Sequence, residues 1–319
     1  MSSPEIAAGV VHRPVSATAS AGLTRWQSGA LLLLAALIWG SAFVGQALGM
    51  DGVGPLSFTA IRFMLGALVV LPLAWREWHQ LQAGGHPLGR QQVSAVVVMG
   101  TLLCAGVVMQ QIALMTTSVT NAGFLTALYV PLVPVLAWLA YRQLPHWSVW
   151  PAALGCLVGT WMLTGASLQA LQRGDLWLLG SVGPWALHVL LVGHLANRLR
   201  GAYVLACGQF AVCAVWSGLM ALSLETLTLD GLGRAAASIA YTGFVSVGVG
   251  YTLQVVGQRH AHPADAAIIL SSETVFAALF GAWFMGDRLG MLGLAGAGLI
   301  LACIVAVQVL PLLGRRLSA

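Results

Sequence analysis

The sequence predicts an all-α polytopic membrane protein, and three observations support this prediction. Hydrophobic residues make up 59% of the 319 residues and charged residues only 7%, whereas a soluble domain carries about 25% charged residues. The apolar residues form about ten runs, each long enough to cross a bilayer core, which needs about 20 helical residues. The segments between these runs are short, so we expect ten transmembrane helices and no soluble catalytic domain.

The first half of the chain supplies five of the predicted helices. They cover residues 28–48, 54–75, 93–115, 119–141 and 148–166. Residues 1–27 precede them and are rich in Ser, Ala, Pro and Gly, which predicts a disordered cytoplasmic tail. Ala47-Leu48-Gly49 resembles a signal-peptide cleavage site, but the run before it is longer than the ~7–15-residue core of a signal peptide. We therefore expect the first run to remain as a helix.

Three of these helices carry residues that mark or interrupt the apolar run. Arg62 lies about a third of the way along the second helix, where a charge is costly; it could brace helices, act in an outer gate or attract a carboxylate. Pro131 and Pro134 interrupt the backbone hydrogen bonds of the fourth helix. Gly155 and Gly159 form a GxxxG pattern in the fifth helix. This pattern could dimerise two chains, but we expect it to pack within a monomer.

The second half supplies the other five helices. They cover residues 175–197, 202–223, 235–257, 264–285 and 290–311, and residues 312–319 form a second cytoplasmic tail. Pro184 interrupts the backbone hydrogen bonds of the sixth helix, which also carries His188 at depth and His194 near its end. Glu273 lies near the middle of the ninth helix, with no basic residue within four positions.

The basic residues are all arginines, and their distribution predicts the orientation. With the N-terminus in the cytoplasm, ten arginines fall in cytoplasmic segments, whereas Arg173, Arg234 and Arg288 fall outside. Because cytoplasmic loops carry an excess of basic residues, both termini are expected in the cytoplasm. Topology thus accounts for the net charge of +5 without a nucleic-acid partner. The five cysteines lie in predicted helices and none has metal-ligand spacing, so we predict no metal and no cofactor.

The two halves of the chain are weakly similar to each other. After a shift of about 145 residues, Ile38-Trp39-Gly40 falls over Pro184-Trp185-Ala186, and Leu136-Ala137-Trp138 falls over Gly281-Ala282-Trp283. Each half has five helices, and five is odd, so the second half (167–311) enters the membrane from the side opposite to the first (28–166). The sequence therefore predicts an inverted-topology repeat, an architecture that recurs in secondary transporters.

Four motifs in order carry a family resemblance. They are Trp39-Gly40-Ser41-Ala42-Phe43, Arg62-Phe63, the segment from Thr117 to Leu125, and Gly286-Asp287-Arg288-Leu289. Together they resemble the motifs of the EamA family of the drug/metabolite transporter superfamily, over roughly residues 28–311. One departure is clear, because Tyr141-Arg142-Gln143-Leu144 lacks the acidic residue that closes the family's first repeat.

The resemblance implies a ten-helix carrier that exports metabolites, often amino acids. Within the family the chain looks most similar to amino-acid exporters of the YddG type. The resemblance also implies a bacterial source, and hence the inner (plasma) membrane as the location.

Polar residues inside the predicted helices are the candidates for a binding site. Glu273 is the best of the charged residues, either as a proton carrier or as a contact for an amino group, although a hydrogen-bonded packing role is the alternative. His188 could line a cavity or be a packed histidine. Gln110, Asn121 and Gln254 are the amides expected nearest a wet central cavity, although amides also cross-link helices.

Aromatic residues give a second indication of a cavity. Many tryptophans lie near helix ends, as the interfacial belt requires, whereas Trp39, Tyr129 and Trp185 lie deeper. Trp39 and Trp185 occupy matching positions in the two halves. We therefore expect them to face each other across the cavity and to hold an apolar substrate.

These features predict a secondary transporter that exports small amphipathic metabolites by alternating access. The chain has no Walker motif, so an ion gradient or the substrate's own gradient must drive transport. It has neither HExxH nor a GxSxG serine motif, so we predict no enzyme. Few charges fall within the helices, which favours neutral or aromatic amino acids; drug-like or quaternary ammonium cations are the alternative.

Overall fold

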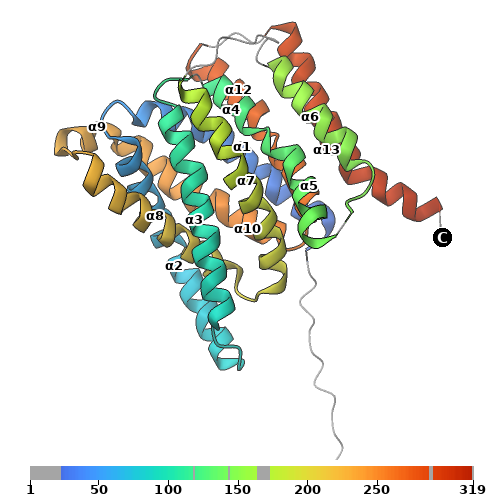
Figure 1. Ribbon diagram of the computed structural model, residues 1–319, viewed down its shortest axis with the longest axis horizontal. Coiled ribbons are helices and arrows are strands. Elements are labelled where there is room, and N and C mark those ends of the chain that lie inside the picture. The colour runs from blue at the N-terminus through green and yellow to red at the C-terminus, as the bar shows by residue number, and fades with distance from the viewer. Residues whose placement is uncertain (1–22, 118, 143, 164–172, 287–289, 318–319) are drawn as a thin grey trace, which may run out of the picture.

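The computed structural model describes residues 23–117, 119–142, 144–163, 173–286 and 290–317. Every regular element within these ranges is a helix (Figure 1). Nine helical segments there are long and apolar enough to cross a membrane, and a tenth apolar helix is shorter. The prediction of an all-α polytopic membrane protein is therefore confirmed. Some predicted segments lie outside the described residues. They are most of the predicted 1–27 tail, the end of the 148–166 helix, the start of the second half, and Asp287-Arg288-Leu289.

The first half follows the predicted helices with small shifts. Its elements are α1 (Arg25–Gly49), α2 (Pro55–Ala83), α3 (Arg90–Ala113), α4 (Val119–Thr126), α5 (Tyr129–Tyr141) and α6 (Val149–Leu163). Helix α1 begins earlier than predicted, because Thr24 and Gln27 form a capping box that satisfies the first backbone amides. Residues 25–27 are thus helical, and the predicted tail was too long.

The second half contains α7 (Arg173–Arg198), α8 (Ala202–Leu224), α9 (Leu229–Ala240), the π-helix η1 (Tyr241–Tyr251), α10 (Thr252–Gln258), α11 (Pro263–Leu270), α12 (Glu273–Phe284) and α13 (Met291–Leu317). Helix α7 runs unbroken through Pro184, so this proline removes one backbone hydrogen bond without ending the helix. One missing N–H costs a single hydrogen bond, and the turns on either side hold the helix. Helix α13 continues to Leu317, so the prediction that 312–319 form a tail is wrong over 312–317.

The two halves pack against each other in matching pairs. The most extensive contacts are those of α2 with α8 and of α6 with α13, in each case between corresponding helices of the two halves (Figure 1). Helix α1 packs on η1, α11 and α12, and its counterpart α7 packs on α3, α4 and α5. Every one of these contacts joins one half to the other, as expected for two inverted repeats around a pseudo-two-fold axis.

The fourth and ninth transmembrane segments are both broken, at positions about 145 residues apart. The first break separates α4 from α5 just before Pro131, whose ring cannot donate a backbone hydrogen bond. The second falls at Ser271 and Ser272, whose hydroxyls donate to the carbonyls of Ile268 and Ile269 at 2.6 and 2.7 Å. Broken helices are tolerated at membrane depth where they line a cavity.

Two glutamates cap helices of the opposite repeat in a symmetric way. The carboxylate of Glu225, at the end of α8, accepts from the amides of Leu56 and Ser57 at 2.8 Å each, at the start of α2. Glu77, near the end of α2, accepts from Tyr203 and Val204 at 2.7 and 3.0 Å, at the start of α8. A carboxylate at a helix N-terminus satisfies orphan amides and complements the helix dipole, so α2 and α8 are tied together at both ends.

The GxxxG pattern of the fifth helix packs inside the chain. An added Cβ at Gly159 would lie 2.7 Å from the carbonyl oxygen of Gly296 and 2.8 Å from Cγ1 of Ile300, both in α13. At Gly155 it would overlap the sulfur of Cys303. The small residues therefore let α6 and α13 approach closely, which agrees with packing within one subunit.

We expect Gly296→Ala to lower the thermal unfolding temperature in detergent. The new methyl would overlap the carbonyl oxygen of Gly159 and lie 2.8 Å from Cβ of Met162, and overpacking of this kind costs about 1–3 kcal/mol. Gly298→Ala, two residues along the same helix, is the matched control. A Cβ at Gly298 meets nothing within 4 Å. Alanine there should keep the unfolding temperature unchanged or raise it, because alanine stabilises a helix by about 1 kcal/mol relative to glycine. Equal behaviour of the two variants would contradict close packing of α6 on α13.

Candidate functional site

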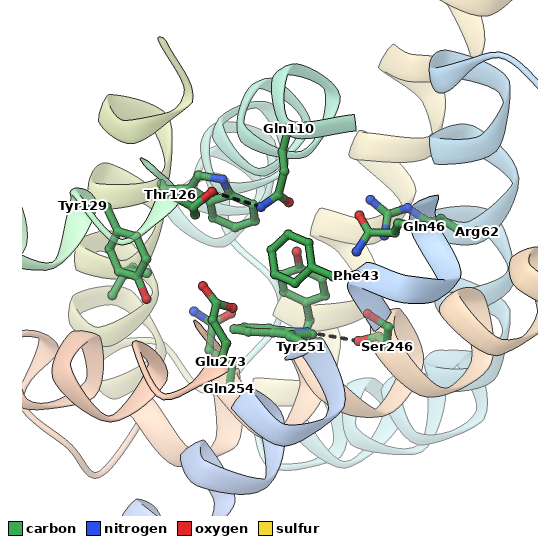
Figure 2. Close-up of a pocket in the computed structure, with 13 residues that line it drawn as sticks. Phe43, Gln46, Arg62, Gln110, Thr126, Tyr129, Ser246, Tyr251, Gln254 and Glu273 are labelled. Atoms are coloured by element: carbon green, nitrogen blue, oxygen red, sulfur yellow. Dashed lines mark hydrogen bonds between the residues drawn. The ribbon is translucent and has the colours of Figure 1, made fainter. Parts of the chain in front are cut away.

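The bundle encloses a small space between the two repeats, which we call the central cavity (Figure 2). The helix break between α4 and α5 and the start of α12 both border it. Its lining residues are Trp39, Phe43, Gln46, Arg62, Gln110, Thr126, Tyr129, Trp185, Val189, Ser246, Tyr251, Gln254 and Glu273. Its free volume is about 30 Å³, which holds about two water molecules. The cavity is thus too small for a metabolite in this conformation and must widen to bind one.

Arg62 contributes the positive charge of the cavity. Its side chain is 2% exposed, and its Nε and Nη2 have no hydrogen-bond partner among the described residues. The guanidinium lies over the rings of Phe58 and Phe63, 5.6 and 5.1 Å from their centroids. Cation–π contacts of this kind offset only part of the cost of burying a charge. Helix bracing was one of our predictions for Arg62, yet these two nitrogens donate to no carbonyl of the described residues.

Glu273 contributes the negative charge. It is the first residue of α12, it is 7% exposed, and its carboxylate makes no hydrogen bond or ion pair with another described residue. Figure 2 shows Arg62 and Gln46 at one side of the central cavity and Glu273 and Gln254 at the opposite side. The two opposite charges therefore face one space without pairing with each other.

Aromatic rings form the wall between the two charges. The centroid of Trp39 lies 4.5 Å from that of Tyr251, and Trp185 stacks parallel to Tyr251 at 6.4 Å. Phe63 and Phe210 also contact Tyr251. The two tryptophans thus meet through Tyr251 rather than directly. Tyr251 was not among the cavity residues predicted from the sequence.

Several polar atoms of lining residues lack partners among the described residues. They include Oε1 of Gln46, Nε1 of Trp185, and both side-chain polar atoms of Gln254. Gln110 has a partner, because its Nε2 donates to the hydroxyl of Thr126 at 3.3 Å. Buried polar groups are usually hydrogen-bonded, so unpaired groups around one cavity indicate a place where water or a polar ligand binds.

One predicted cavity residue, His188, is not among the residues that line the central cavity. His188 is fully buried, and its Nε2 lies 2.9 Å from Oε1 of Gln209 in α8. Its ring also contacts that of Trp185 edge-on at 6.1 Å. This histidine therefore ties α7 to α8, and the prediction that it lines the cavity is not what the structure shows. The side chain of Asn121 lies outside the described residues.

Other lining residues could not be expected from the sequence. Thr126 and Val189 are ordinary members of apolar runs, and only the fold turns them inward. Phe43 belongs to the first family motif, but it was not predicted to line a cavity. Ser246 lies in η1, where its carbonyl accepts from Nε1 of Trp39 at 3.3 Å. A π-helix exposes backbone carbonyls differently from an α-helix and often occurs at functional sites. The amino-acid composition of a segment does not predict where a π-helix forms.

Sequence comparison gives a family. The EamA-like transporter family matches the chain twice, over residues 27–165 and 172–308. The chain is 29% identical over 287 residues to an uncharacterized transporter of Archaeoglobus fulgidus, covering 90% of this chain and 87% of that protein. It is 25% identical over 294 residues to the uncharacterized transporter YwfM of Bacillus subtilis, covering 88% and 93%.

Structural comparison gives the same fold. One solved structure, described only as the crystal structure of a protein, superposes with a TM-score of 0.73 at 19% identity and covers 93% of this chain and 100% of that one. At this identity the likeness concerns the fold alone. The family matches, which fall on two consecutive stretches of about equal length, carry the assignment: the chain belongs to the EamA-like transporter family.

Proposed function

We propose that this transporter exports neutral, partly apolar amino acids across the inner membrane by alternating access. One observation carries the proposal: Arg62 and Glu273, neither with an ion-pair partner among the described residues, face the same aromatic cavity from opposite sides. An amino-acid zwitterion carries one charge of each sign. Its carboxylate would pair with Arg62, its ammonium with Glu273, and its side chain would lie against Trp39, Tyr251 and Trp185.

The charge balance favours a zwitterion over a cation. A quaternary ammonium compound could use Glu273 and the aromatic faces, but it would leave the guanidinium of Arg62 buried beside a second positive charge. A multiply anionic cargo would need further cations, and among the described residues Arg62 is the only basic one that lines the central cavity. Inward-facing apolar rings favour substrates with apolar or aromatic side chains.

Outward direction and membrane orientation rest on two further arguments. The excess of arginines on the side of both termini supports a cytoplasmic position for that side. The family resemblance, and the similarity to amino-acid exporters that the motifs suggest, favour export. The collapsed cavity and the broken helices of both repeats support a mechanism in which the two halves rock to open the site to each side in turn.

The experiment is substrate flux in proteoliposomes that contain the purified protein. The panel contains labelled neutral, aromatic, acidic and basic amino acids and labelled tetraphenylphosphonium. Vesicles are loaded with one compound at a time and diluted into buffer that contains or lacks the same compound without label. We expect saturable efflux of neutral apolar or aromatic amino acids that the same compound on the other side stimulates. Transport of the cation but of no amino acid, by protein shown to be folded, would replace this proposal with the cation alternative. Flux that does not saturate would indicate a channel.

A further inference from the structure

A second hollow opens at the end of the molecule where α1 begins, and we call it the terminal vestibule. Its free volume is about 600 Å³, which is within the range of small-molecule sites. Its polar lining is basic, because it contains Arg198 and Arg259 together with His194, His260 and His262. Tyr141 stacks flat on His194, with ring centroids 3.9 Å apart, and forms one wall.

The terminal vestibule is aligned with the central cavity along three helices. On α7, Val189 lines the cavity and Leu190 the vestibule. On α5, Tyr129 lines the cavity and Tyr141 the vestibule. Gln254 on α10 lines the cavity, and the vestibule residue Arg259 follows directly after that helix. The two spaces are therefore consecutive along the bundle axis.

The residues between the two spaces form what we call the floor. Gln258 is fully buried at the end of α10, and its Nε2 donates to the backbone carbonyl of Val189 at 3.0 Å. Its Oε1 has no partner among the described residues. Pro263 packs against Gly193 of α7, where an added Cβ would lie 2.7 Å from the proline Cγ. Opening a path from the vestibule to the central cavity would have to break the bond from Gln258 to Val189.

The fixed charge of the vestibule is positive. Neither Arg198 nor Arg259 has a carboxylate within salt-bridge distance among the described residues. Asp265 is the acidic residue nearest to Arg259 along the chain, and its Oδ2 pairs with Nη2 of Arg25 at 3.0 Å. Burial lowers the pKa of His262, so this imidazole adds no charge at pH 7. A hollow lined by charges of one sign, with low-dielectric walls, concentrates ions of the opposite sign.

We infer that the terminal vestibule is the loading site of the transporter and that Arg198 and Arg259 recruit the carboxylate of the substrate before the floor opens. The inference rests on the proposed function and extends it, because it adds a first binding step outside the central cavity. The carboxylate then has cationic partners at two successive positions, the vestibule arginines and Arg62. Substrates that lack a free carboxylate lose the first of these steps.

The first test is loading kinetics from the vestibule side in vesicles of neutral lipid, with the best-transported amino acid of the panel. Arg198→Gln and Arg259→Gln should each raise the KM by about 3–10-fold at low salt and change the maximal rate by less than about twofold. Arg200→Gln is the matched control, since Arg200 is exposed at the same end but does not line the vestibule. Salt should raise the wild-type KM and leave the double variant unchanged.

Two results of this test would overturn the inference. In the first, all three variants behave alike, which would assign the effect to general surface charge. In the second, Arg198→Gln and Arg259→Gln lower the maximal rate only in vesicles that contain anionic lipid. That would assign the arginines to lipid headgroups.

A second test needs no transported substrate. Tyr141→Cys places a thiol on the vestibule wall, and the unmodified protein gives the background of its native cysteines. The labelling rate of each methanethiosulfonate reagent is divided by its rate with a free thiol in solution. This relative rate should be at least about threefold higher for a sulfonate-bearing reagent than for a trimethylammonium reagent. Adding Arg198→Gln and Arg259→Gln should abolish the preference. No preference in Tyr141→Cys would overturn the charged vestibule. A clear preference in a protein that moves no amino acid would instead show that the proposed function had failed and the vestibule had not.

Discussion

Arg62→Met is expected to reduce amino-acid transport by at least about 30-fold while leaving the protein as stable as wild type or more stable. The guanidinium is buried, and two of its nitrogens have no hydrogen-bond partner among the described residues. Losing one partner of a buried charge pair costs about 2–5 kcal/mol, so a substrate carboxylate that pairs with Arg62 would bind far more weakly. The same change removes an uncompensated buried ion, and apolar replacement of buried ions is often neutral or stabilising.

The measurement combines exchange flux in proteoliposomes with thermal unfolding in detergent. Arg62→Lys should recover part of the flux, because it keeps the charge but loses the planar fork that binds a carboxylate bidentately. Arg76→Met is the matched control, since Arg76 is exposed on the same helix; it should leave both quantities unchanged. A lower unfolding temperature in Arg62→Met, together with full flux, would assign Arg62 to helix packing and remove it from the site.

Glu273→Gln is expected to remove the dependence of flux on a pH gradient while exchange of unlabelled for labelled amino acid continues. The carboxylate is buried beside the central cavity without an ion-pair or hydrogen-bond partner among the described residues. A carboxylate in such a place can take up and release a proton as the site opens to each side, whereas an amide cannot. Glutamine keeps the volume and can still accept a hydrogen bond from the substrate ammonium.

This prediction is measured with vesicles in which an acidic outside compartment drives efflux of the panel's best substrate. In wild type the gradient should raise the initial rate, whereas in Glu273→Gln it should have no effect. Exchange by Glu273→Gln should stay within about threefold of wild type, because the bond from the charged ammonium to the glutamine oxygen is worth more than a hydrogen bond between neutral groups. Asp51→Asn, at an exposed acid near the end of α1, should behave as wild type. A gradient effect of equal size in Glu273→Gln would show that another group carries the proton. No gradient effect in wild type would make transport facilitated diffusion.

The positions of the helices could be read from the sequence because bilayer thickness imposes them. Each crossing needs about 20 apolar residues, and because this chain has few charged residues, its apolar runs are easy to delimit. The first break could also be expected, since Pro131 and Pro134 remove backbone donors. The second break has no proline. It depends on Ser271 and Ser272, whose hydroxyls bond back to the preceding turn, and serines in a helix often do so without breaking it.

The candidate site was only partly predictable. Trp39 and Trp185 were found through their matching places in the two halves, and Arg62 and Glu273 through the cost of a charge at depth. His188 has the same outward signal, depth in an apolar helix, yet it bonds to Gln209 and does not line the cavity. Which of these polar residues faces a cavity depends on the rotation of each helix against its neighbours, and neighbours from the other repeat set that rotation.

The sequence by itself determined the class of protein, the number and order of its helices, the duplication and the family motifs, because these follow from local composition and from periods along one chain. Only the tertiary structure decided that Tyr251 joins the two tryptophans, that Arg62 and Glu273 share one cavity without pairing, and that Arg198 and Arg259 line one vestibule. These relations join residues far apart in the chain. They depend on packing between helices, where small residues such as Gly159 and Gly296 fix how closely two backbones approach.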